Sequence, residues 1–242
     1  MGFASDVVFY EILCLSGRFD IIASLSFNVT KASSIRCLVT AGPTREWLDP
    51  VRFLSNPSTG KMGFAVADAA RERGWEVDLI SGPVNLDASS GVRRTFVETA
   101  DEMLDACLDL FGSCDFMIMA AAVCDHKPTR IAKNKLKKSE MSTILEMEQT
   151  PDILGELGRR KASGQHLVGF AAETNDCLSN GKQKLFEKNL DWIVVNDVSS
   201  PDRGFASDCN EVTLLGRNGE IVPIALASKL EVARTLLGKI DS

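Results

Sequence analysis

The stretch that decides the fold is Ile-Arg-Cys-Leu-Val-Thr-Ala-Gly-Pro, residues 35–43. Its first six residues, Ile35–Thr40, form a short apolar run, and the turn signal Ala41-Gly42-Pro43 follows at once. A short apolar run that is closed by glycine and proline predicts a buried strand ending in a tight turn. We therefore expect the regular part of the chain to begin at Ile35.

Downstream of this strand, apolar runs alternate with amphipathic segments. We predict further strands at Glu76–Ile80, Phe116–Ala120, His166–Phe170 and Trp192–Val195. We predict helices at Gly60–Arg73, Ala100–Phe111, Pro151–Arg160, Asp176–Lys188 and Ala227–Ile240. Near the C-terminus, Asn218-Gly219 lies between the apolar runs Val212–Leu215 and Ile221–Ile224, which predicts a two-residue hairpin connection. The pattern indicates an α/β, Rossmann-like fold with a mostly parallel sheet, helices on both faces and a C-terminal β-hairpin.

The composition excludes several classes of protein. The chain has 242 residues and a net charge of −6, and an acidic chain is a poor general binder of nucleic acid. Its seven cysteines are scattered without a CxxC pair, and its two histidines lie far apart in the sequence. A zinc site or a disulfide framework is therefore not expected, and reduced thiols in a cytoplasmic protein are the simpler interpretation.

The first 34 residues form a separate problem. Their two apolar patches are interrupted by Asp6, Glu11, Arg18 and Asp20, which argues against a membrane-spanning helix, and no basic start of a signal peptide is present. Two interpretations stay open, a short helical extension or an upstream start that was assigned in error. We therefore divide the chain into residues 1–34, of unknown role, and a domain at 35–242.

The loops after the predicted strands carry the candidate site, because parallel sheets bind ligands at the carboxyl ends of their strands. Small residues open the first helix, and their backbone N–H groups favour an anion. The candidate phosphate-binding residues are Ser58, Thr59, Gly60, Lys61 and Arg45. An ordinary helix cap by Ser58 or Thr59 is the alternative. The loop matches neither a Walker A motif nor GxGxxG, which disfavours a nicotinamide-dependent reductase.

Other segments allow a functional and a structural interpretation. Ala120–Asp125 places small side chains at a strand end, where they either admit a flat ligand or allow close helix packing. The lysines at 133, 135, 137 and 138 either bind a polyphosphate or form a solvated loop. Lys184 and Lys188 lie one helical turn apart and face the same way. Phe170 either stacks on a base or packs in the core.

Taken together, these segments resemble the phosphopantothenoylcysteine synthetase family, the phosphopantothenate–cysteine ligases of coenzyme A biosynthesis. The resemblance runs from Ile35 to the C-terminus in the family's order. Its motifs are TAGPTRE, DPVRFLSNPSTGKMG, SGPV, AAAVCD, NKLKK, TPDIL, VGFAAET, KNLD and VNDVSSPDRGF. As a set they are far more specific than any single motif.

The resemblance implies a role for each matched residue. Asn56 corresponds to the asparagine that acts on the acyl-nucleotide intermediate, and Lys135 to the lysine needed to form that intermediate. The implied nucleotide-binding residues are Ala121, Ala122, Asp125, Lys135, Pro151, Asp152, Ile153, Leu154, Phe170, Lys184 and Lys188. The stretch after Val123 departs from the family's pattern, so the contacts of the residues that follow Asp125 are in doubt. The donors near Ser58–Lys61 are our candidate for holding the substrate's own phosphate.

The resemblance also implies the reaction and its partners. It indicates a ligase of the bacterial type, which couples 4'-phosphopantothenate to L-cysteine through an acyl-cytidylate and uses CTP with Mg²⁺. Family members are typically homodimers, and Val212–Ile224 is a plausible contact for a second copy. Many relatives carry a fused flavin-dependent decarboxylase domain, so we expect that activity on a separate chain. A non-catalytic nucleotide-binding module remains an alternative beside the reductase.

Overall fold

The computed structural model describes residues 34–138, 144–197 and 207–242, and its main unit is Ile35–Ser242. The predicted N-terminal extension therefore lies outside the described residues apart from Ser34. The strands are β1 (Arg36–Ala41), β2 (Arg45–Asp49), β3 (Arg52–Ser55), β4 (Glu76–Ser81), β5 (Val92–Phe96), β6 (Phe116–Met119), β7 (His126–Pro128), β8 (Met147–Gln149), β9 (His166–Glu173), β10 (Trp192–Asp197), β11 (Cys209–Gly216) and β12 (Ile221–Ser228). The helices are α1 (Lys61–Glu72), α2 (Ala100–Phe111), α3 (Ile153–Arg160), α4 (Cys177–Glu187) and α5 (Lys229–Ile240).

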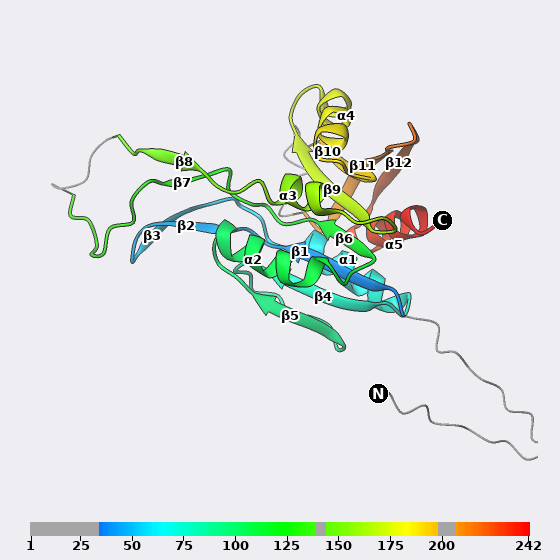
Figure 1. Ribbon diagram of the computed structural model, residues 1–242, viewed down its shortest axis with the longest axis horizontal. Coiled ribbons are helices and arrows are strands. Elements are labelled where there is room, and N and C mark those ends of the chain that lie inside the picture. Colours follow the sequence, from blue (N-terminus) through cyan, green and yellow to red (C-terminus); the bar gives the residue numbers. More distant parts are fainter. Residues whose placement is uncertain (1–33, 139–143, 198–206) are drawn as a thin grey trace, which may run out of the picture. The chain divides into compact units, whose positions relative to one another are not determined.

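One eight-stranded sheet organises this unit, with the order β12-β11-β10-β9-β6-β1-β4-β5 (Figure 1). Six neighbouring strands of this sheet, β10, β9, β6, β1, β4 and β5, pair in parallel. Strands β11 and β12 continue the sheet with antiparallel pairing. This arrangement confirms the predicted Rossmann-like α/β fold, since a parallel sheet needs helical crossovers between its strands. The C-terminal hairpin is the end of the main sheet rather than a separate appendage.

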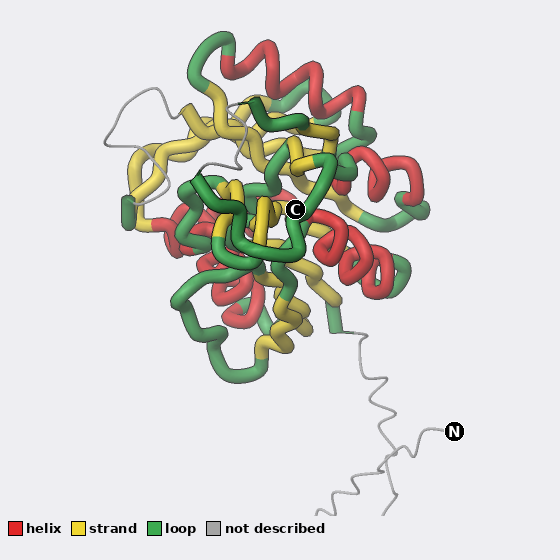
Figure 2. Tube along the Cα trace, turned by 90° about the vertical axis from the view of Figure 1, so that its left-hand side faces the viewer, coloured by secondary structure: helices red, strands yellow, loops and turns green. Residues whose placement is uncertain are grey.

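The helices cover both faces of this sheet, as predicted (Figure 2). Residues of α1 and α5 pack with Val39, Val77 and Ile118 in one apolar cluster. Residues of α2, α3 and α4 pack with Leu38 and Met117 in the other. Neighbouring residues of one strand thus enter opposite clusters, which explains why the central strands are apolar at nearly every position.

Two helices begin with caps that their sequences encode. Thr99 and Glu102 form a capping box at α2, and Ser228 and Glu231 form another at α5. Helix α1 begins differently, because Gly60 stands at the cap position with a left-handed backbone and no side chain caps the helix. The alternative in which Ser58 or Thr59 caps α1 is therefore wrong.

Three parts of the fold were not predicted. The edge strand β5 is rich in polar residues, and the short pairs β2–β3 and β7–β8 form two small antiparallel sheets. These two pairs contact each other and extend from the main sheet to the same side (Figure 1). We call residues 45–55 and the described parts of 126–149 the arm.

The connection of the C-terminal hairpin also differs from the prediction. The N–H of Gly216 donates to the carbonyl of Glu220 at 2.8 Å, so three residues rather than two separate the paired positions. Gly219 has a φ of 90°, whereas Asn218 is not in the left-handed region. A type I turn followed by a left-handed glycine fits this geometry, so the Asn-Gly signal found the hairpin but not its turn type.

In the described part of the chain, no helix is both long and apolar enough to cross a membrane. The cysteines at 37, 107, 114, 124, 177 and 209 are free thiols. These two findings concern only the residues described.

Helix α1 approaches β1 closely at Gly63. A Cβ atom on Gly63 would lie 2.5 Å from the Cβ of Ala41 and 2.8 Å from the carbonyl oxygen of Thr40. We expect Gly63→Ala to lower the free energy of unfolding by about 1–3 kcal/mol, because neither neighbour can move away without shifting β1. Urea unfolding measures the change.

Gly238 provides the matched control on α5, because a Cβ there meets nothing within 4 Å. Gly238→Ala should leave stability unchanged or raise it by up to about 1 kcal/mol, as alanine favours a helix over glycine. Equal effects of the two substitutions would contradict a close contact between α1 and β1.

Candidate active site

A cavity of about 870 Å³ lies at the carboxyl ends of the central strands. Its walls come from the segment after β6, the last part of β9, the end of β10, and the first residues of α1, α3 and α5. Lys184 of α4 and Lys188, the residue that ends this helix, also line the cavity. This is the edge at which a parallel sheet is expected to bind ligands.

The first wall is built by a backbone ladder that continues past the ends of β1 and β6. The N–H of Ala122 donates to the carbonyl of Gly42 at 2.9 Å, and the N–H of Thr44 donates to the carbonyl of Ala122 at 3.3 Å. The N–H of Cys124 donates to the Thr44 hydroxyl at 2.9 Å. These bonds hold residues 120–124 extended, so that Ala121 and Ala122 face the cavity with small side chains.

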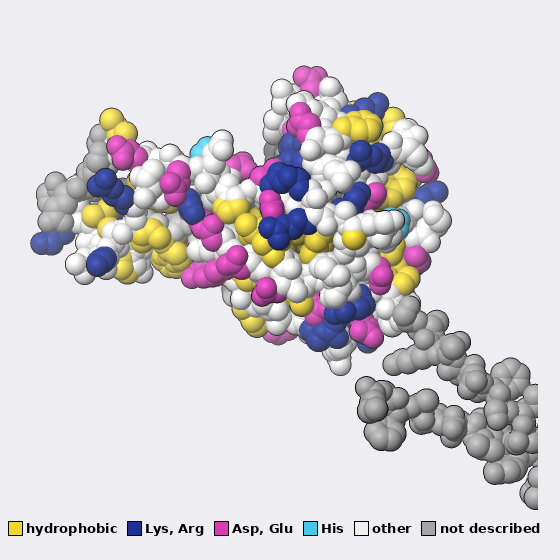
Figure 3. Space-filling view, viewed as in Figure 1, with side chains coloured by type: hydrophobic (Ala, Val, Ile, Leu, Met, Phe, Trp, Pro, Cys, Tyr) yellow, Lys and Arg dark blue, Asp and Glu magenta, His cyan; other side chains and the backbone are white. Residues whose placement is uncertain are grey.

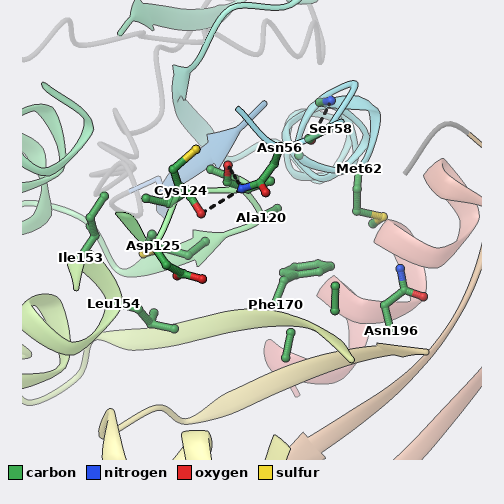
Figure 4. Close-up of a pocket in the computed structure, with 18 of the residues that line it drawn as sticks. Asn56, Ser58, Met62, Ala120, Cys124, Asp125, Ile153, Leu154, Phe170 and Asn196 are labelled. Atoms are coloured by element: carbon green, nitrogen blue, oxygen red, sulfur yellow. Dashed lines mark hydrogen bonds between the residues drawn. The ribbon is translucent and has the colours of Figure 1, made fainter. Parts of the chain in front are cut away.

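Asn56 is anchored to this wall by its side-chain nitrogen (Figure 4). Its Nδ2 atom donates to the carbonyls of Ala122 at 3.1 Å and of Val123 at 3.0 Å. Because both partners are acceptors only, the nitrogen must face them and the orientation of the amide is fixed. The oxygen Oδ1 is therefore the atom that Asn56 offers to a ligand as an acceptor.

The opposite wall carries charged groups. Asp152 caps α3 by accepting from the N–H of Gly155 at 3.1 Å, and it also accepts from Lys188 at 2.7 Å. Burial acts to raise the pKa of Asp152, but these two hydrogen bonds outweigh burial and the pKa is lowered. Lys184 donates to Glu173 at 2.6 Å. The two lysines of α4 thus face the same cavity, as their spacing predicted.

The cavity gathers most of the residues predicted from sequence. It is lined by Asn56, Ser58, Thr59, Gly60, Lys61, Ala121, Ala122, Asp125, Pro151, Asp152, Ile153, Leu154, Phe170, Lys184 and Lys188. Phe170 and Asp125 project into it from neighbouring walls (Figure 4). These segments are distant in sequence, and only the parallel sheet brings them together.

Two predicted residues do not line the cavity. Arg45 lies on β2, where its guanidinium is 3.8 Å from Glu98 and stacks 4.5 Å from the centre of the Phe53 ring. Lys135 is exposed on the arm. The next residue, Leu136, donates its backbone N–H to the Asp49 carboxylate at 3.2 Å. The other lysines of its cluster, at positions 133, 137 and 138, are also absent from the lining.

Cys124 lines the cavity, and its thiol donates to the carbonyl of Thr44 at 3.6 Å. It is 8% exposed, and burial raises the pKa of its thiol. A protonated thiol in such surroundings is a poor nucleophile. Cys124 is therefore better described as a packing residue of this wall than as a nucleophile.

The cavity also includes residues that the sequence reasoning missed or left open. Asn196, at the end of β10, has a buried Oδ1 atom that makes no hydrogen bond within the described residues. Lys229 and Asn210 line the cavity although each is less than 9% exposed. No local pattern marks a buried lysine at a helix start, so only the packing of α5 reveals it.

Comparison with known proteins assigns the chain to a family. Residues 32–242 match the family described as DNA/pantothenate metabolism flavoprotein C-terminal domain. The chain belongs to this family. The match covers the whole sheet and every residue of the cavity.

The relatives and solved structures agree with this assignment. The chain is 46% identical over 204 residues to the coenzyme A biosynthesis bifunctional protein CoaBC of Bacillus subtilis (strain 168), a match that covers 84% of this chain and 50% of that protein. It is 43% identical over 206 residues to a cysteine/cysteine sulfinic acid decarboxylase from an unknown prokaryotic organism, covering 85% and 57%. The chain thus spans about half the length of the curated relatives it matches.

Among solved structures, the C-terminal domain of CoaBC superposes with a TM-score of 0.74 at 40% identity. The match covers 86% of this chain and 94% of that one. This chain therefore corresponds to nearly the whole of that C-terminal domain.

The orientation of Asn56 predicts how a carboxylate would behave there. Asn56→Asp replaces the donor with an oxygen that faces two carbonyls, so we expect a loss of about 1–3 kcal/mol of stability at neutral pH. The repulsion raises the folded-state pKa above the unfolded value, so the variant loses stability as pH rises through that range. Below about pH 4, where a protonated carboxyl can donate, the difference from wild type should shrink.

Urea unfolding between pH 3.5 and 8 measures this difference. Asn218→Asp is the matched control, because the Asn218 side chain accepts through its oxygen from the N–H of Glu220 at 3.0 Å. A carboxylate keeps that bond, so the control should stay near wild type throughout. A pH-independent loss for Asn56→Asp would contradict the assigned amide orientation.

Proposed function

We propose that the chain is a phosphopantothenate–cysteine ligase that works through an acyl-cytidylate. The observation that carries the proposal is the meeting of Asn56, Ala121–Asp125 and the lysines of α4 in one cavity. Membership of the family and the 46% identity to CoaBC support it. The same cavity offers small walls for a flat base, cations for phosphates and a fixed amide oxygen for an attacking amine.

The first half-reaction activates the carboxylate. A carboxylate oxygen of 4'-phosphopantothenate attacks the α-phosphorus of CTP, and the bond from that phosphorus to the bridging oxygen breaks with release of pyrophosphate. Negative charge develops on the departing phosphates, and cations placed in advance stabilise it. The lysines of the cavity, and Lys135 if it reaches the site, are the groups that supply this charge.

The second half-reaction forms the amide. The amine of L-cysteine attacks the acyl carbon, CMP leaves with the electron pair of the broken carbon–oxygen bond, and the nitrogen loses a proton. Asn56 suits this step through Oδ1, because its nitrogen is already held by two backbone carbonyls. An oxygen acceptor can orient an attacking amine and cannot stabilise an acyl oxygen. We therefore assign Asn56 to positioning the cysteine amine.

CTP is proposed over ATP because the NKLKK segment resembles the bacterial branch of the family. Asp125 lines the same cavity and is an acceptor for the exocyclic amine of the base. Phe170 would provide an apolar face for the ring.

Mg²⁺ is proposed as an ion that enters with the nucleotide. The described residues hold no group of three or more metal-ligating side chains. Their cavity-lining carboxylates are Asp125 and Asp152, and Asp152 is already bound to Lys188. This donor set fits the usual mode of Mg²⁺, which is held mainly by substrate phosphates and waters with one or two carboxylates. The ion would offset phosphate charge during the first step.

The proposal predicts CTP-dependent turnover. With 4'-phosphopantothenate, L-cysteine and Mg²⁺, the protein should release CMP and pyrophosphate, and release should need all substrates. The measurement is coupled pyrophosphate detection, with ATP in a parallel series. Robust turnover with ATP and none with CTP would reject the nucleotide assignment.

Two other outcomes separate the rival functions. Binding of CTP without any pyrophosphate release in a folded sample would favour a non-catalytic nucleotide-binding module. Binding of NADPH with a change in cofactor fluorescence, and no response to CTP, would favour a reductase. Either result rejects the ligase proposal.

A homodimer is proposed to complete the site. Besides the edge strand β12, the arm offers a surface for a second copy, and its exposed apolar side chains include Val51, Phe53, Ile131 and Ile144. Hydrophobic side chains gather over the arm in Figure 3. Exposed apolar groups of this kind mark interaction surfaces. We favour the arm over Val212–Ile224, because the arm also carries Lys135, which does not line its own cavity.

Complementation tests this arrangement. Lys135→Gln should block formation of the acyl-cytidylate and Asn56→Asp its transfer to cysteine, so each variant alone should be inactive. If Lys135 acts in the partner's cavity, a mixed dimer contains one intact site, and a reassorted equimolar mixture should recover roughly a quarter of wild-type activity. If the loop acts in its own cavity, every site carries one lesion and no activity returns. Size-exclusion chromatography with light scattering verifies that the mixture is dimeric.

A further inference from the structure

The carboxylate of Asp49 is buried although the residue lies on the arm, outside the cavity. Asp49 ends β2, at the turn that leads into β3. An aspartate is rarely buried so completely unless its charge has partners. Here the two carboxylate oxygens have different donors, and these donors belong to different parts of the arm.

The oxygen Oδ1 holds the turn between β2 and β3. It accepts from the backbone N–H of Val51 at 2.9 Å and from that of Arg52 at 3.0 Å. Bonds from an Asp side chain to backbone groups two and three residues on are typical of tight turns, and an asparagine oxygen makes them equally well. This half of the carboxylate therefore serves the hairpin alone.

The oxygen Oδ2 holds a segment that is distant in sequence. It accepts from the backbone N–H of Leu136 at 3.2 Å and from Nε of Arg52 at 3.0 Å. Nη2 of Arg52 donates to the same oxygen and also to the carbonyl of Leu136, at 3.0 Å. The Asp49–Arg52 ion pair thus binds both backbone groups of Leu136.

The charge of this ion pair strengthens its hold on Leu136. Hydrogen bonds from Arg52 keep the pKa of Asp49 well below its usual value, so the carboxylate is ionised at neutral pH. Hydrogen bonds to an ionised group are roughly twice as strong as those between neutral groups. A single backbone contact at Leu136 can therefore fix the segment around it.

Lys135 is the residue directly before this contact. The segment passes the tip of the β2–β3 hairpin, and it is tied there a second time, by the N–H of Ala132, which donates to the carbonyl of Leu48 at 3.0 Å (Figure 1). Lys135 lies between the two ties, and its side chain is exposed. A backbone that is fixed in advance leaves only the side chain of Lys135 to be ordered when it meets a ligand.

We propose that Asp49 is a positioning residue, which holds the backbone beside Lys135 through its Oδ2 atom and through Arg52. The catalytic meaning of this contact rests on the proposed function, in which Lys135 stabilises charge during formation of the acyl-cytidylate. Displacing a catalytic group by about 1 Å can slow a reaction about a hundred-fold. The contact at Leu136 would prevent such a displacement.

Asp49→Asn separates the two roles of the carboxylate. Asparagine keeps an oxygen for the turn at Val51 and Arg52, but it places an NH2 group where Oδ2 accepted. Hydrogen exchange followed by NMR reports both sets of bonds. The Leu136 amide should exchange at least about ten-fold faster, the effect of losing a charge-assisted hydrogen bond, whereas the amides of Val51 and Arg52 should exchange as in wild type.

Single-turnover kinetics measure the effect on the reaction. With labelled 4'-phosphopantothenate and CTP but no cysteine, Asp49→Asn should form acyl-cytidylate about ten- to a hundred-fold more slowly. Transfer from preformed acyl-cytidylate to added cysteine should stay close to the wild-type rate. Because Asp49 acts through Lys135, adding Asp49→Asn to Lys135→Gln should cause no further loss of the residual rate. Losses that multiply would overturn the proposal.

Asp78→Asn is the matched control. Asp78 also binds an arginine through both oxygens, since Arg93 donates to each of them at 2.7 Å, but it contacts neither the arm nor the cavity. Its variant should match wild type in Leu136 exchange and in both half-reactions. A slow first step in this variant as well would show that loss of any such ion pair is enough, and it would overturn a special role of Asp49.

The remaining outcomes separate this inference from the proposed function. Wild-type exchange at Leu136 in Asp49→Asn overturns the contact, and faster exchange with normal formation of acyl-cytidylate overturns its positioning role. Leu136→Pro removes the same N–H without changing Asp49, so normal formation in that variant is decisive even if Asp49→Asn does not fold. A folded wild type that forms no acyl-cytidylate rejects the proposed function instead, and exchange at Leu136 still decides whether Asp49 holds the segment.

Discussion

The hydrogen-bond ladder between β1 and β6 does not stop where the two strands end, and the site depends on this continuation. Backbone bonds between residues 42–44 and 120–124 carry the parallel pairing into the loops, where Pro43 and Ala122 still form a bridge. Loops at a strand end normally have to satisfy their backbone groups elsewhere. Here each loop satisfies the other, so the wall of the cavity is as fixed as the sheet below it. The Asn56 side chain is held in place by the same wall, because it donates to two of its carbonyls.

A second constraint follows from the packing of α1 on β1. Only a residue without a side chain fits between α1 and the carbonyl of Thr40, and Gly63 occupies that position. The close approach aims the first turn of α1 at the carboxyl edge of the sheet, beside the first turn of α5. The packing of α1 on β1 places Lys61 at this edge of the sheet, and the packing of α5 against α1 places Lys229 beside the same cavity.

The sequence predicted the central architecture because its physical signals are local. Strands such as Phe116–Met119 are apolar at every position, and the start of α2 is marked by the capping box of Thr99 and Glu102. The strand β5 was not predicted, because its two arginines, Arg93 and Arg94, interrupt the apolar pattern of a buried strand. Arg93 reaches Asp78 of the neighbouring strand at 2.7 Å, a pairing between strands that no local pattern contains. The arm was not predicted for the same reason, since its short strands are held by contacts between distant segments.

The candidate site divides in the same way. Residues in the segment after a buried strand, such as Ala121 and Asp125, line the cavity as predicted, because the position of the strand constrains theirs. Arg45 and Lys135 do not line the cavity, because both lie on the arm. Nor does a sequence reveal the direction of the Asn56 amide, which depends on carbonyls 66 and 67 positions away. The burial of Lys229 is equally hidden, since its ammonium donates to the carbonyl of Ser207, 22 positions away.

This division has a chemical consequence for the proposed two-step ligase. Groups that grip the base and the acyl intermediate throughout both steps belong on the rigid wall, where preorganisation costs nothing at the moment of reaction. A cation needed only while pyrophosphate departs can instead sit on a separate element, since its charge would hold the leaving group back if it stayed. Under the proposed function, Asn56 on the ladder and Lys135 on the arm fit that distinction, because Asn56 lines the cavity and Lys135 does not.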